Sequence, residues 1–204
     1  MIKLLEKLDE KIQDRKTAKN VLEENTRKMD DLLKHHEDLE EARVIFQKAA
    51  QVTQSQLSEQ ISKIVSSALA AVFADPYTFV VDFVSRRNTT ECDLLFEKNG
   101  KRRSPLASCG YGAADIASLA LRVAYWKLSN NSRNVLCLDE PLRNLSLDKQ
   151  PLASMMIKNL SKMHGGLQFI IVTHNTALSE SADRVFTVKK EDNVSHVVEV
   201  GKTV

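Results

Sequence analysis

The chain has 204 residues, of which 43% are apolar and 27% charged, with a formal net charge of +2 at pH 7. This length fits one domain, or one domain with an appendage, and the near-neutral charge gives no global indication of nucleic-acid binding. No apolar run approaches the ~20 residues that span a bilayer, and the charged N-terminus lacks a signal peptide's apolar stretch. The three cysteines have no CxxC spacing, so we expect neither a disulfide framework nor a zinc site. Together these features predict a cytoplasmic protein without a membrane partner.

The first 75 residues contain neither glycine nor proline; the first proline is Pro76 and the first glycine is Gly100. Charges of both signs interleave here, with 12 Lys/Arg and 13 Asp/Glu up to Val72, as on a solvated helix surface. The pattern predicts one long helix followed by a mixed domain. We divide the chain into a coiled-coil arm over 1–60 and a lobe over 61–204.

Apolar residues recur along the arm in two phases. One set falls near a 3–4 spacing: Leu5, Leu8, Ile12, Leu22, Met29 and Leu33. A second set steps by seven in a shifted phase: Leu32, Leu39 and Phe46. This broken heptad is typical of a coiled coil that changes register, and its stripe needs a partner helix; the alternative is an arm that packs on its own domain. The denser apolar spacing from Ile61 to Val72 predicts a helix entering a globular core.

Two segments rich in strand formers follow Pro76, namely Tyr77–Val84 and Cys92–Lys98. We expect Ser85–Glu91 to be a polar connection between them and Asn99-Gly100 to be a hairpin turn.

Basic residues flank these strands, as Arg86-Arg87 and Lys101-Arg102-Arg103. Such clusters either contact DNA phosphates or form the solvated surface of a hairpin, and the sequence leaves both interpretations open.

A Gly-x-Gly turn, Gly110-Tyr111-Gly112, leads into Ile116–Leu128, which is helical by its Ala/Leu content and spacing. A turn of this kind at a helix N-terminus exposes backbone N–H groups and the positive end of the helix dipole, which together can cradle a phosphate. The alternative is an ordinary tight turn.

Two apolar strands end in polar residues. The first runs from Asn134 into Asp139 and Glu140, and the second runs from Leu167 into Thr173 and His174. Continuous apolar runs predict strands buried on both faces of a parallel sheet, where ligands bind at the carboxyl ends. One carboxylate there can hold Mg²⁺, a second can polarise an attacking water, and the histidine fits a γ-phosphate sensor. The alternatives are an acid pair that caps a helix after the strand and a histidine that is an ordinary polar residue.

The remaining elements are predicted from local pattern. They are a helix at about Leu147–Met163, a turn at Gly165-Gly166, strands at Ala182–Val188 and Ser195–Val200, and a turn at Lys189–Asn193 between those strands.

In their order and spacing, these segments resemble the C-terminal half of an ABC-type ATPase head, especially in SMC and SbcC-type double-strand-break-repair ATPases. Cys109–Arg122 occupies the place of the ABC signature and its helix, Val135–Pro141 that of Walker B, Leu142–Ser146 that of the D-loop, and Phe169–His174 that of the H-loop. The resemblance implies an α/β fold: a P-loop NTPase-like, ABC-type C-terminal lobe with a long N-terminal coiled-coil helix.

The resemblance also implies ATP and Mg²⁺ as cofactors and assigns roles by position. Asp139 would hold Mg²⁺ through water, Glu140 would be the general base, and His174 would contact the γ-phosphate. The nucleotide-binding set would be Gly110, Tyr111, Gly112 and Ala113, which meet ATP on an opposing head, together with Ser146.

The sequence departs from the family pattern at two of these places. The signature usually reads Ser-Gly-Gly-Glu, and Gly110 stands where its serine would be, so the serine's hydroxyl contact to the γ-phosphate is lost while backbone N–H donors remain. Ser108 and Tyr111 are the residues that could compensate. Ser146 stands where the D-loop usually has aspartate.

A Walker A loop is missing from this sequence. Its one Gly-Lys-Thr begins at Gly201, but a P-loop needs another glycine five residues earlier, where His196 stands, and a helix afterwards. We therefore expect the phosphate-cradling lobe to come from elsewhere, so that the chain is either a natural split subunit or a portion of a longer protein.

Three hypotheses follow. In the first, the chain is inactive alone and forms a composite ATPase with a Walker A-bearing lobe or chain and with a second head. ATP-driven engagement of the heads would be coupled to DNA repair, recombination or replication. DNA and an SbcD-like nuclease are the partners that the family implies. In the second, it is a non-catalytic coiled-coil adaptor. In the third, it is a DNA-binding module without ATP dependence.

Overall fold

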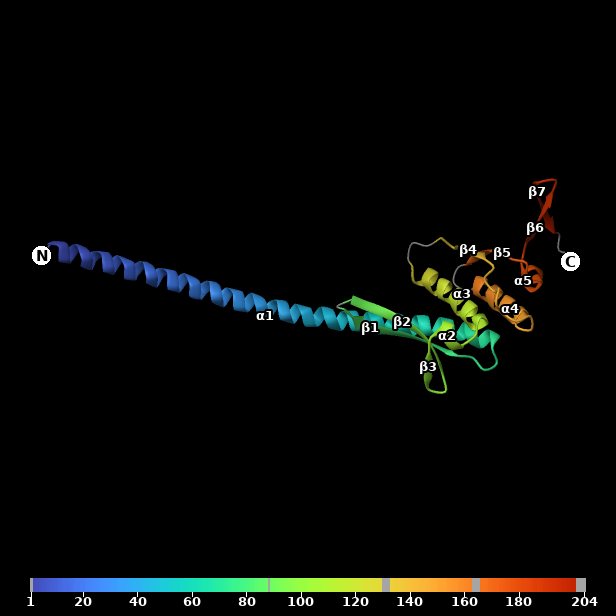
Figure 1. Cartoon of the computed structure of the whole chain (residues 1–204), viewed down its shortest axis with the longest axis horizontal. Coiled ribbons are helices and arrows are strands. Elements are labelled where there is room, and N and C mark those ends of the chain that lie inside the picture. The colour runs from blue at the N-terminus through green and yellow to red at the C-terminus, as the bar shows by residue number, and fades with distance from the viewer. Residues whose placement is uncertain (1, 88, 130–132, 163–165, 201–204) are drawn as a thin grey trace. The chain divides into compact units, whose positions relative to one another are not determined.

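The computed structural model describes the chain except for residues 1, 88, 130–132, 163–165 and 201–204. The chain divides into two compact units, Met1–Gln54 and Ser55–Val204, with the boundary inside helix α1 (Ile2–Val72; Figure 1). This helix is continuous because no glycine or proline interrupts it. None of the helices in the described part of the chain is long and apolar enough to cross a membrane.

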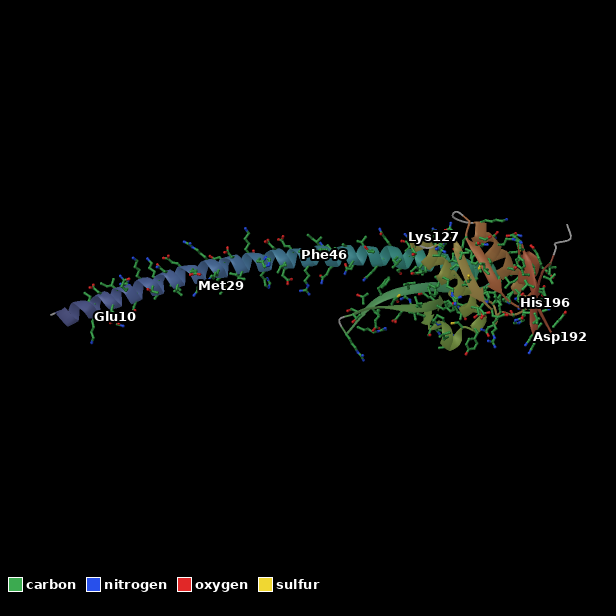
Figure 2. The ribbon with its side chains drawn as sticks, turned by 90° about the horizontal axis from the view of Figure 1, so that it is seen from above. Glu10, Met29, Phe46, Lys127, Asp192 and His196 are labelled. Atoms are coloured by element: carbon green, nitrogen blue, oxygen red, sulfur yellow. The ribbon has the colours of Figure 1, made fainter. Side chains whose placement is uncertain are left out.

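The first unit consists of α1 up to Gln54. Its apolar side chains lie exposed along the helix; Phe46, for example, is 75% exposed, and Figure 2 labels it and Met29. Charged side chains one turn apart, such as Glu24 and Lys28 at 2.6 Å, pair along the same surface. The apolar stripe of this unit therefore has no cover within the unit.

The second unit is built around one apolar core that includes the last turns of α1. Four residues at the predicted spacing are buried there: Val65, Ala68, Leu69 and Val72. Ser66 Oγ accepts a hydrogen bond from the amide of Phe79 at 2.8 Å, and Ser58 Oγ donates to the carbonyl of Val81 at 2.5 Å. The helix ends before Pro76, whose ring cannot continue it.

An antiparallel sheet packs on this part of α1, with its strands in the order β1 (Thr78–Arg86), β2 (Thr89–Lys98) and β3 (Lys101–Arg103). Asn99 and Gly100 have φ of +52° and +69°, which confirms the hairpin turn. The predicted polar connection at Ser85–Glu91 is wrong for most of its length, since both strands extend into it. Cross-strand ion pairs support the extension, because Arg86 contacts Glu91 at 3.0 Å and Asp93 at 2.6 Å.

Two helices follow the sheet, α2 (Pro105–Ser108) and α3 (Tyr111–Leu128). The second begins at Tyr111, earlier than predicted, because Gly110 turns the chain with φ of +79° and accepts the Ala114 N–H at 3.4 Å. The predicted inner face of α3 is buried, at Ile116, Leu119, Ala120 and Val123.

A parallel pair of strands, β4 (Val135–Asp139) and β5 (Gln168–Val172), is connected through α4 (Gln150–Lys162). Leu138 is buried and Phe169 and Ile171 are partly buried, on the side that joins the core. The alternating residues of β5 point the other way, and Ile170 and Val172 are exposed. The prediction of burial on both faces is therefore wrong for the described chain by itself, since only one face of the pair is covered.

The last described elements are α5 (Thr176–Ser181) and a hairpin of β6 (Val185–Glu191) and β7 (Val194–Val200). The two strands are antiparallel; β7 lies where the sequence predicts it, while β6 begins and ends three residues later than the predicted Ala182–Val188. The turn is shorter than predicted: Asp192 and Asn193 alone form it, with φ of +47° and +65°, as in a type I′ turn.

Candidate functional site

Glu140 and His174, the two predicted catalytic residues, are in direct contact. Glu140 Oε1 accepts the main-chain N–H of His174 at 3.1 Å and lies 2.9 Å from its Nδ1. Thr173 Oγ donates to Glu140 Oε2 at 3.2 Å, and the Glu140 amide donates to the Val172 carbonyl at 2.9 Å. The carboxyl ends of β4 and β5 thus join through one side chain.

Local structure fixes both partners. Glu140 has a φ of +44°, an uncommon backbone conformation for a residue with a side chain. Asn175, next to His174, caps α5 by accepting the amides of Ala177 and Leu178 at 3.0 and 3.4 Å. The strand end and the following helix cap therefore hold His174 close to Glu140.

This contact favours the ionised form of Glu140. The hydrogen bond from the His174 ring, aided by that from Thr173, lowers the pKa of Glu140 below its ordinary value and outweighs partial desolvation. The Glu140 side chain is 31% exposed and that of His174 is 83% exposed. Glu140 is an ionised carboxylate at neutral pH, with about one of its four acceptor positions left for water.

Asp139, the predicted metal ligand, ends β4 beside Val172 of β5 and is exposed. Its carboxylate makes no hydrogen bond or ion pair with any described residue. No three His, Cys, Asp or Glu side chains in the described ranges gather to hold a metal ion. Asp139 therefore fits Mg²⁺ only in the way this ion commonly binds, through one or two carboxylates with water and phosphate oxygens as the other ligands.

The predicted nucleotide-binding residues lie together around a second location, a cavity of about 330 Å³. All five line it: Gly110, Tyr111, Gly112, Ala113 and Ser146. The cavity also has an aromatic side, formed by Phe73 and Tyr77, and a basic side chain, Lys149. The signature turn and the D-loop segment are thus neighbours, although 28 residues separate them in sequence.

The turn itself explains the departure at Gly110. Its φ of +79° is a conformation that L side chains rarely adopt, although a Cβ there would meet nothing within 4 Å. A serine at this position would strain the backbone rather than crowd a neighbour. The next residue, Tyr111, has its side chain 67% exposed at the first position of α3. The side chain of Ser108 lies outside the described part.

One residue of this region was not singled out from the sequence. Asp115, in α3, accepts the main-chain N–H of Asn144 at 2.8 Å and the Asn144 Nδ2 at 3.3 Å. No local pattern could have identified the pair, because its members are 29 positions apart.

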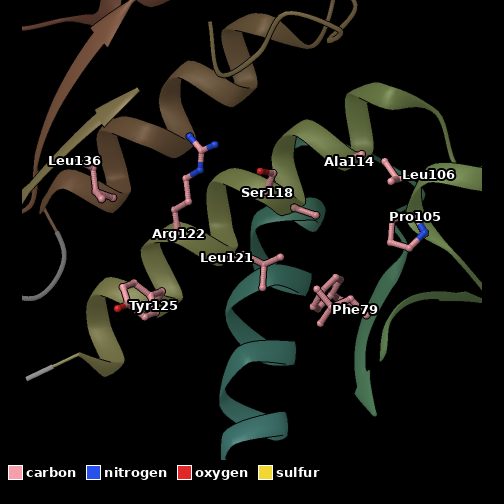
Figure 3. A pocket seen from close by; sticks show the side chains of 11 residues that line it. Phe79, Pro105, Leu106, Ala114, Ser118, Leu121, Arg122, Tyr125 and Leu136 are labelled. Atoms are coloured by element: carbon pink, nitrogen blue, oxygen red, sulfur yellow. The ribbon is translucent and has the colours of Figure 1, made fainter. Parts of the chain in front are cut away.

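A larger groove, of about 560 Å³, lies along another face of α3 (Figure 3). Apolar side chains such as Phe79, Leu106, Leu121 and Tyr125 line it, and among the described residues Arg122 is the one charged side chain in the lining. It contains none of the predicted site residues.

The basic clusters are partly neutralised. Arg86 pairs with Glu91 and Asp93, and Arg102 pairs with Asp82 at 2.6 Å and Glu97 at 2.8 Å. These contacts raise the pKa of both guanidinium groups, first through the hydrogen bonds to Asp93 and to Glu97 respectively. Four carboxylates thus surround two arginines, which favours the interpretation of a solvated hairpin.

Comparison with known proteins bears on the whole arrangement. No family model matches the chain. The chain is 32% identical over 114 residues to the DNA double-strand break repair Rad50 ATPase of Saccharolobus solfataricus, a match that covers 56% of this chain and 13% of that protein. The chain therefore spans a small part of this curated relative's length.

Solved structures of SMC proteins share the fold. A structure from work on ATP-driven dimerization and DNA-stimulated activation of SMC ATPases matches with a TM-score of 0.56 and 22% identity, over 74% of this chain and 89% of that one. The Smc head domain of Pyrococcus furiosus, with an extended coiled coil and bound to the C-terminal domain of ScpA, matches with a TM-score of 0.57 and 21% identity, over 70% and 35%.

The architecture is thus that of the C-terminal lobe of an SMC-type ATPase head with its coiled-coil helix. Together with the Rad50 match, it confirms the resemblance found in the sequence: this chain is similar to part of an SMC/Rad50-type ABC ATPase head.

Proposed function

We propose that this chain is the C-terminal part of an SMC/Rad50-like ABC ATPase head, which hydrolyses ATP only when a Walker A-bearing lobe or chain completes the site. The proteins that it resembles are named as ATPases. Most of the predicted ATPase residues fall into two groups, the Glu140–His174 pair with Asp139 beside it and the cavity around Gly112.

The uncovered side of the β4–β5 pair is the observation that carries this proposal. Parallel sheets occur almost only with both faces covered, yet Ile170 is 50% and Val172 is 64% exposed on one face. Two parallel strands of five residues each are also too few for an independent sheet. The missing cover lies next to Asp139 and His174, where a completing lobe would bring the phosphate-binding loop.

The residues at this edge then divide the work. Asp139 would hold Mg²⁺ through water, and that ion, when bound, offsets negative charge on the phosphates of ATP. Glu140, ionised and with an acceptor position left, would take the proton of the attacking water. His174 has Nδ1 committed to Glu140, so Nε2 is the ring nitrogen that remains for the γ-phosphate.

The signature turn would act on a second head. Its backbone N–H groups at the start of α3 point away from the helix without intrahelical partners. Gly110–Ala113 and Ser146 would contact ATP bound to the opposing head, so that two heads engage around nucleotide. ATP-driven dimerization is named for one SMC relative.

The arm over residues 1–60 would pair with a second helix to form an antiparallel coiled coil, with the lobe over 61–204 as the head portion. Its exposed stripe, including Met29 and Phe46, is the surface that such a helix would cover. The proposed assembly also includes DNA and an SbcD-like nuclease. The ATPase would serve the repair, recombination or replication of that DNA, and we place the assembly in the cytoplasm.

The composite site is tested by reconstitution. The purified chain alone should hydrolyse no ATP, and adding the matching N-terminal lobe should produce activity that Glu140→Gln abolishes. Glu191→Gln, which removes an exposed carboxylate of β6, is the matched control and should leave turnover unchanged. Turnover like that of the wild type in Glu140→Gln would refute the assignment.

The altered signature favours one second candidate, a non-catalytic adaptor. Gly110 offers no hydroxyl, and its backbone conformation does not suit the serine of the family. In this case the complex of this chain with the Walker A-bearing lobe would still form, but ATP would not change the oligomeric state of that complex. Analytical ultracentrifugation of the pair with and without ATP separates the two candidates. The ion-paired Arg86 and Arg102 give a DNA-binding module less support.

A further inference from the structure

Asp115 connects the two groups of site residues. Both of its oxygens are used on one residue, since Oδ2 accepts the main-chain N–H of Asn144 at 2.8 Å and Oδ1 accepts the Asn144 side-chain Nδ2 at 3.3 Å. An ionised carboxylate forms stronger hydrogen bonds than a neutral acceptor. The first turns of α3 thus hold the middle of the D-loop segment at two points.

A close backbone approach supports the same connection. A Cβ on Gly112 would lie 3.1 Å from the Asn144 carbonyl oxygen and 3.2 Å from Leu145 Cδ1. The signature turn therefore rests directly on the segment that Asp115 holds, and the absence of a side chain at Gly112 allows it.

From Asn144 the segment leads back to Glu140 through tight turns. Leu145 N–H bonds to the Leu142 carbonyl at 3.1 Å, and Arg143 N–H bonds to the Glu140 carbonyl at 3.3 Å. Leu142 and Leu145 are buried, which anchors the segment to the core. A short, hydrogen-bonded and anchored path thus joins Asn144 to the end of β4.

We propose that Asp115 is a positioning residue, which ties the signature turn to the D-loop segment so that a ligand engaged at the turn sets the placement of the Glu140 carboxylate. The proposal rests on the proposed function, because it gives Glu140 its catalytic task. Asp115 acts through Asn144, which donates hydrogen bonds to both of its carboxylate oxygens.

The first test needs no activity. Amide hydrogen exchange is measured on the full chain for wild type, Asp115→Ala and Asp115→Asn, with Ser118→Ala on the same helix as control. In Asp115→Ala the peptide over residues 140–146 should exchange at least about 10-fold faster, while the peptides of α3 and α4 stay within about 2-fold. Asp115→Asn should behave like wild type, because its Oδ1 can accept the Asn144 N–H and its Nδ2 can donate to Asn144 Oδ1 once the Asn144 side-chain amide has turned over.

The second test uses the reconstituted ATPase. We expect Asp115→Ala to lower kcat about 10-fold or more with KM within about 2-fold, because misplacement of a catalytic group affects the chemical step. Asp115→Asn should restore most of kcat. Asn144→Ala in the Asp115→Ala background should add little, since both changes break one link.

Three results would overturn the proposal: unchanged exchange over 140–146, an unchanged kcat, or equal exchange increases throughout the lobe, which would indicate general destabilisation. If Asp115→Ala does not fold, Asp115→Ser replaces it, because one hydroxyl cannot hold both groups of Asn144. Exchange and kcat like those of the wild type in Asp115→Ser would then overturn the proposal. If the wild-type pair hydrolyses no ATP, the proposed function fails and the exchange result alone decides the link.

Discussion

One oxygen of Glu140 serves two groups of His174, the main-chain N–H at 3.1 Å and the ring Nδ1 at 2.9 Å. The contact spans the ends of two parallel strands, β4 and β5, that the chain connects through α4. It places a carboxylate and an imidazole side by side with Asp139 as the next residue, so the chemistry assigned to this edge rests on one compact arrangement.

The Glu140 contact predicts a pH-dependent stability difference. Because hydrogen bonding to His174 and Thr173 lowers the Glu140 pKa in the folded state, its stabilisation is present above the ordinary value of 4.5 and is lost as the pH falls through the lower, folded value. The Tm of wild type should exceed that of Glu140→Gln at neutral pH, and the difference should shrink below pH 4.5. Thermal unfolding followed by circular dichroism measures it, with Glu191→Gln as control. A difference that is constant with pH would contradict the prediction.

Gly112→Ala should destabilise the lobe by ~1 kcal/mol, although alanine is the better helix former. The new Cβ would press on the Asn144 carbonyl oxygen at 3.1 Å, and Asp115 prevents Asn144 from yielding. In an Asp115→Ala background the cost should be smaller, because the segment can then move. Urea unfolding of the four variants gives the coupling energy, and additive effects would show that the two contacts are independent.

Val172→Lys should separate stability from assembly. Val172 is exposed, so the substitution should change the unfolding free energy of the chain alone by less than ~0.5 kcal/mol. It should nevertheless prevent binding of the completing lobe, because a charge would be buried in that interface. Isothermal titration with the lobe checks this prediction, and Val194→Lys on the hairpin is the control. Wild-type affinity in Val172→Lys would place the interface elsewhere.

Any affinity for duplex DNA should depend on Arg87, Lys101 and Arg103 more than on Arg86 and Arg102. The latter two already contact carboxylates, so they release few counterions on binding phosphates. Replacing Arg86 and Arg102 by Gln should leave the salt dependence of binding unchanged, while replacing Lys101 and Arg103 should make it shallower. Fluorescence anisotropy over a salt series measures both slopes, and the reverse order would contradict the prediction.

The sequence predicts elements well where local physics decides them. The long helix follows from the absence of glycine and proline, and the Asn99-Gly100 turn follows from its dipeptide. Strand ends were predicted less well, because the bonds that extend them are not local. Arg86 forms ion pairs with Glu91 and Asp93 across the hairpin, and the turn propensity of Ser85–Glu91 does not predict these contacts.

The same limit applies to the site. The residues at Gly110–Ala113 and Ser146 share one cavity, an arrangement that their spacing alone does not contain. The link between Asp115 and Asn144 could not be predicted, because it depends on how α3 meets the segment after β4. The apolar runs of β4 and β5 predict burial of both faces, and this fails in the described part of the chain, where Ile170 and Val172 are exposed. The proposed completing lobe would supply the missing cover.

The exposed side of β5 has a practical consequence for making the protein. Ile170 and Val172 form an apolar strip on a short strand, and the outer edge of β5 pairs with no described strand. Such edges template wrong pairings between copies. The yield of non-aggregated protein from a recombinant host should therefore fall as the expression level rises. It should recover when the proposed completing lobe is produced in the same cells, so correct assembly would depend on the two polypeptides being synthesised at the same time.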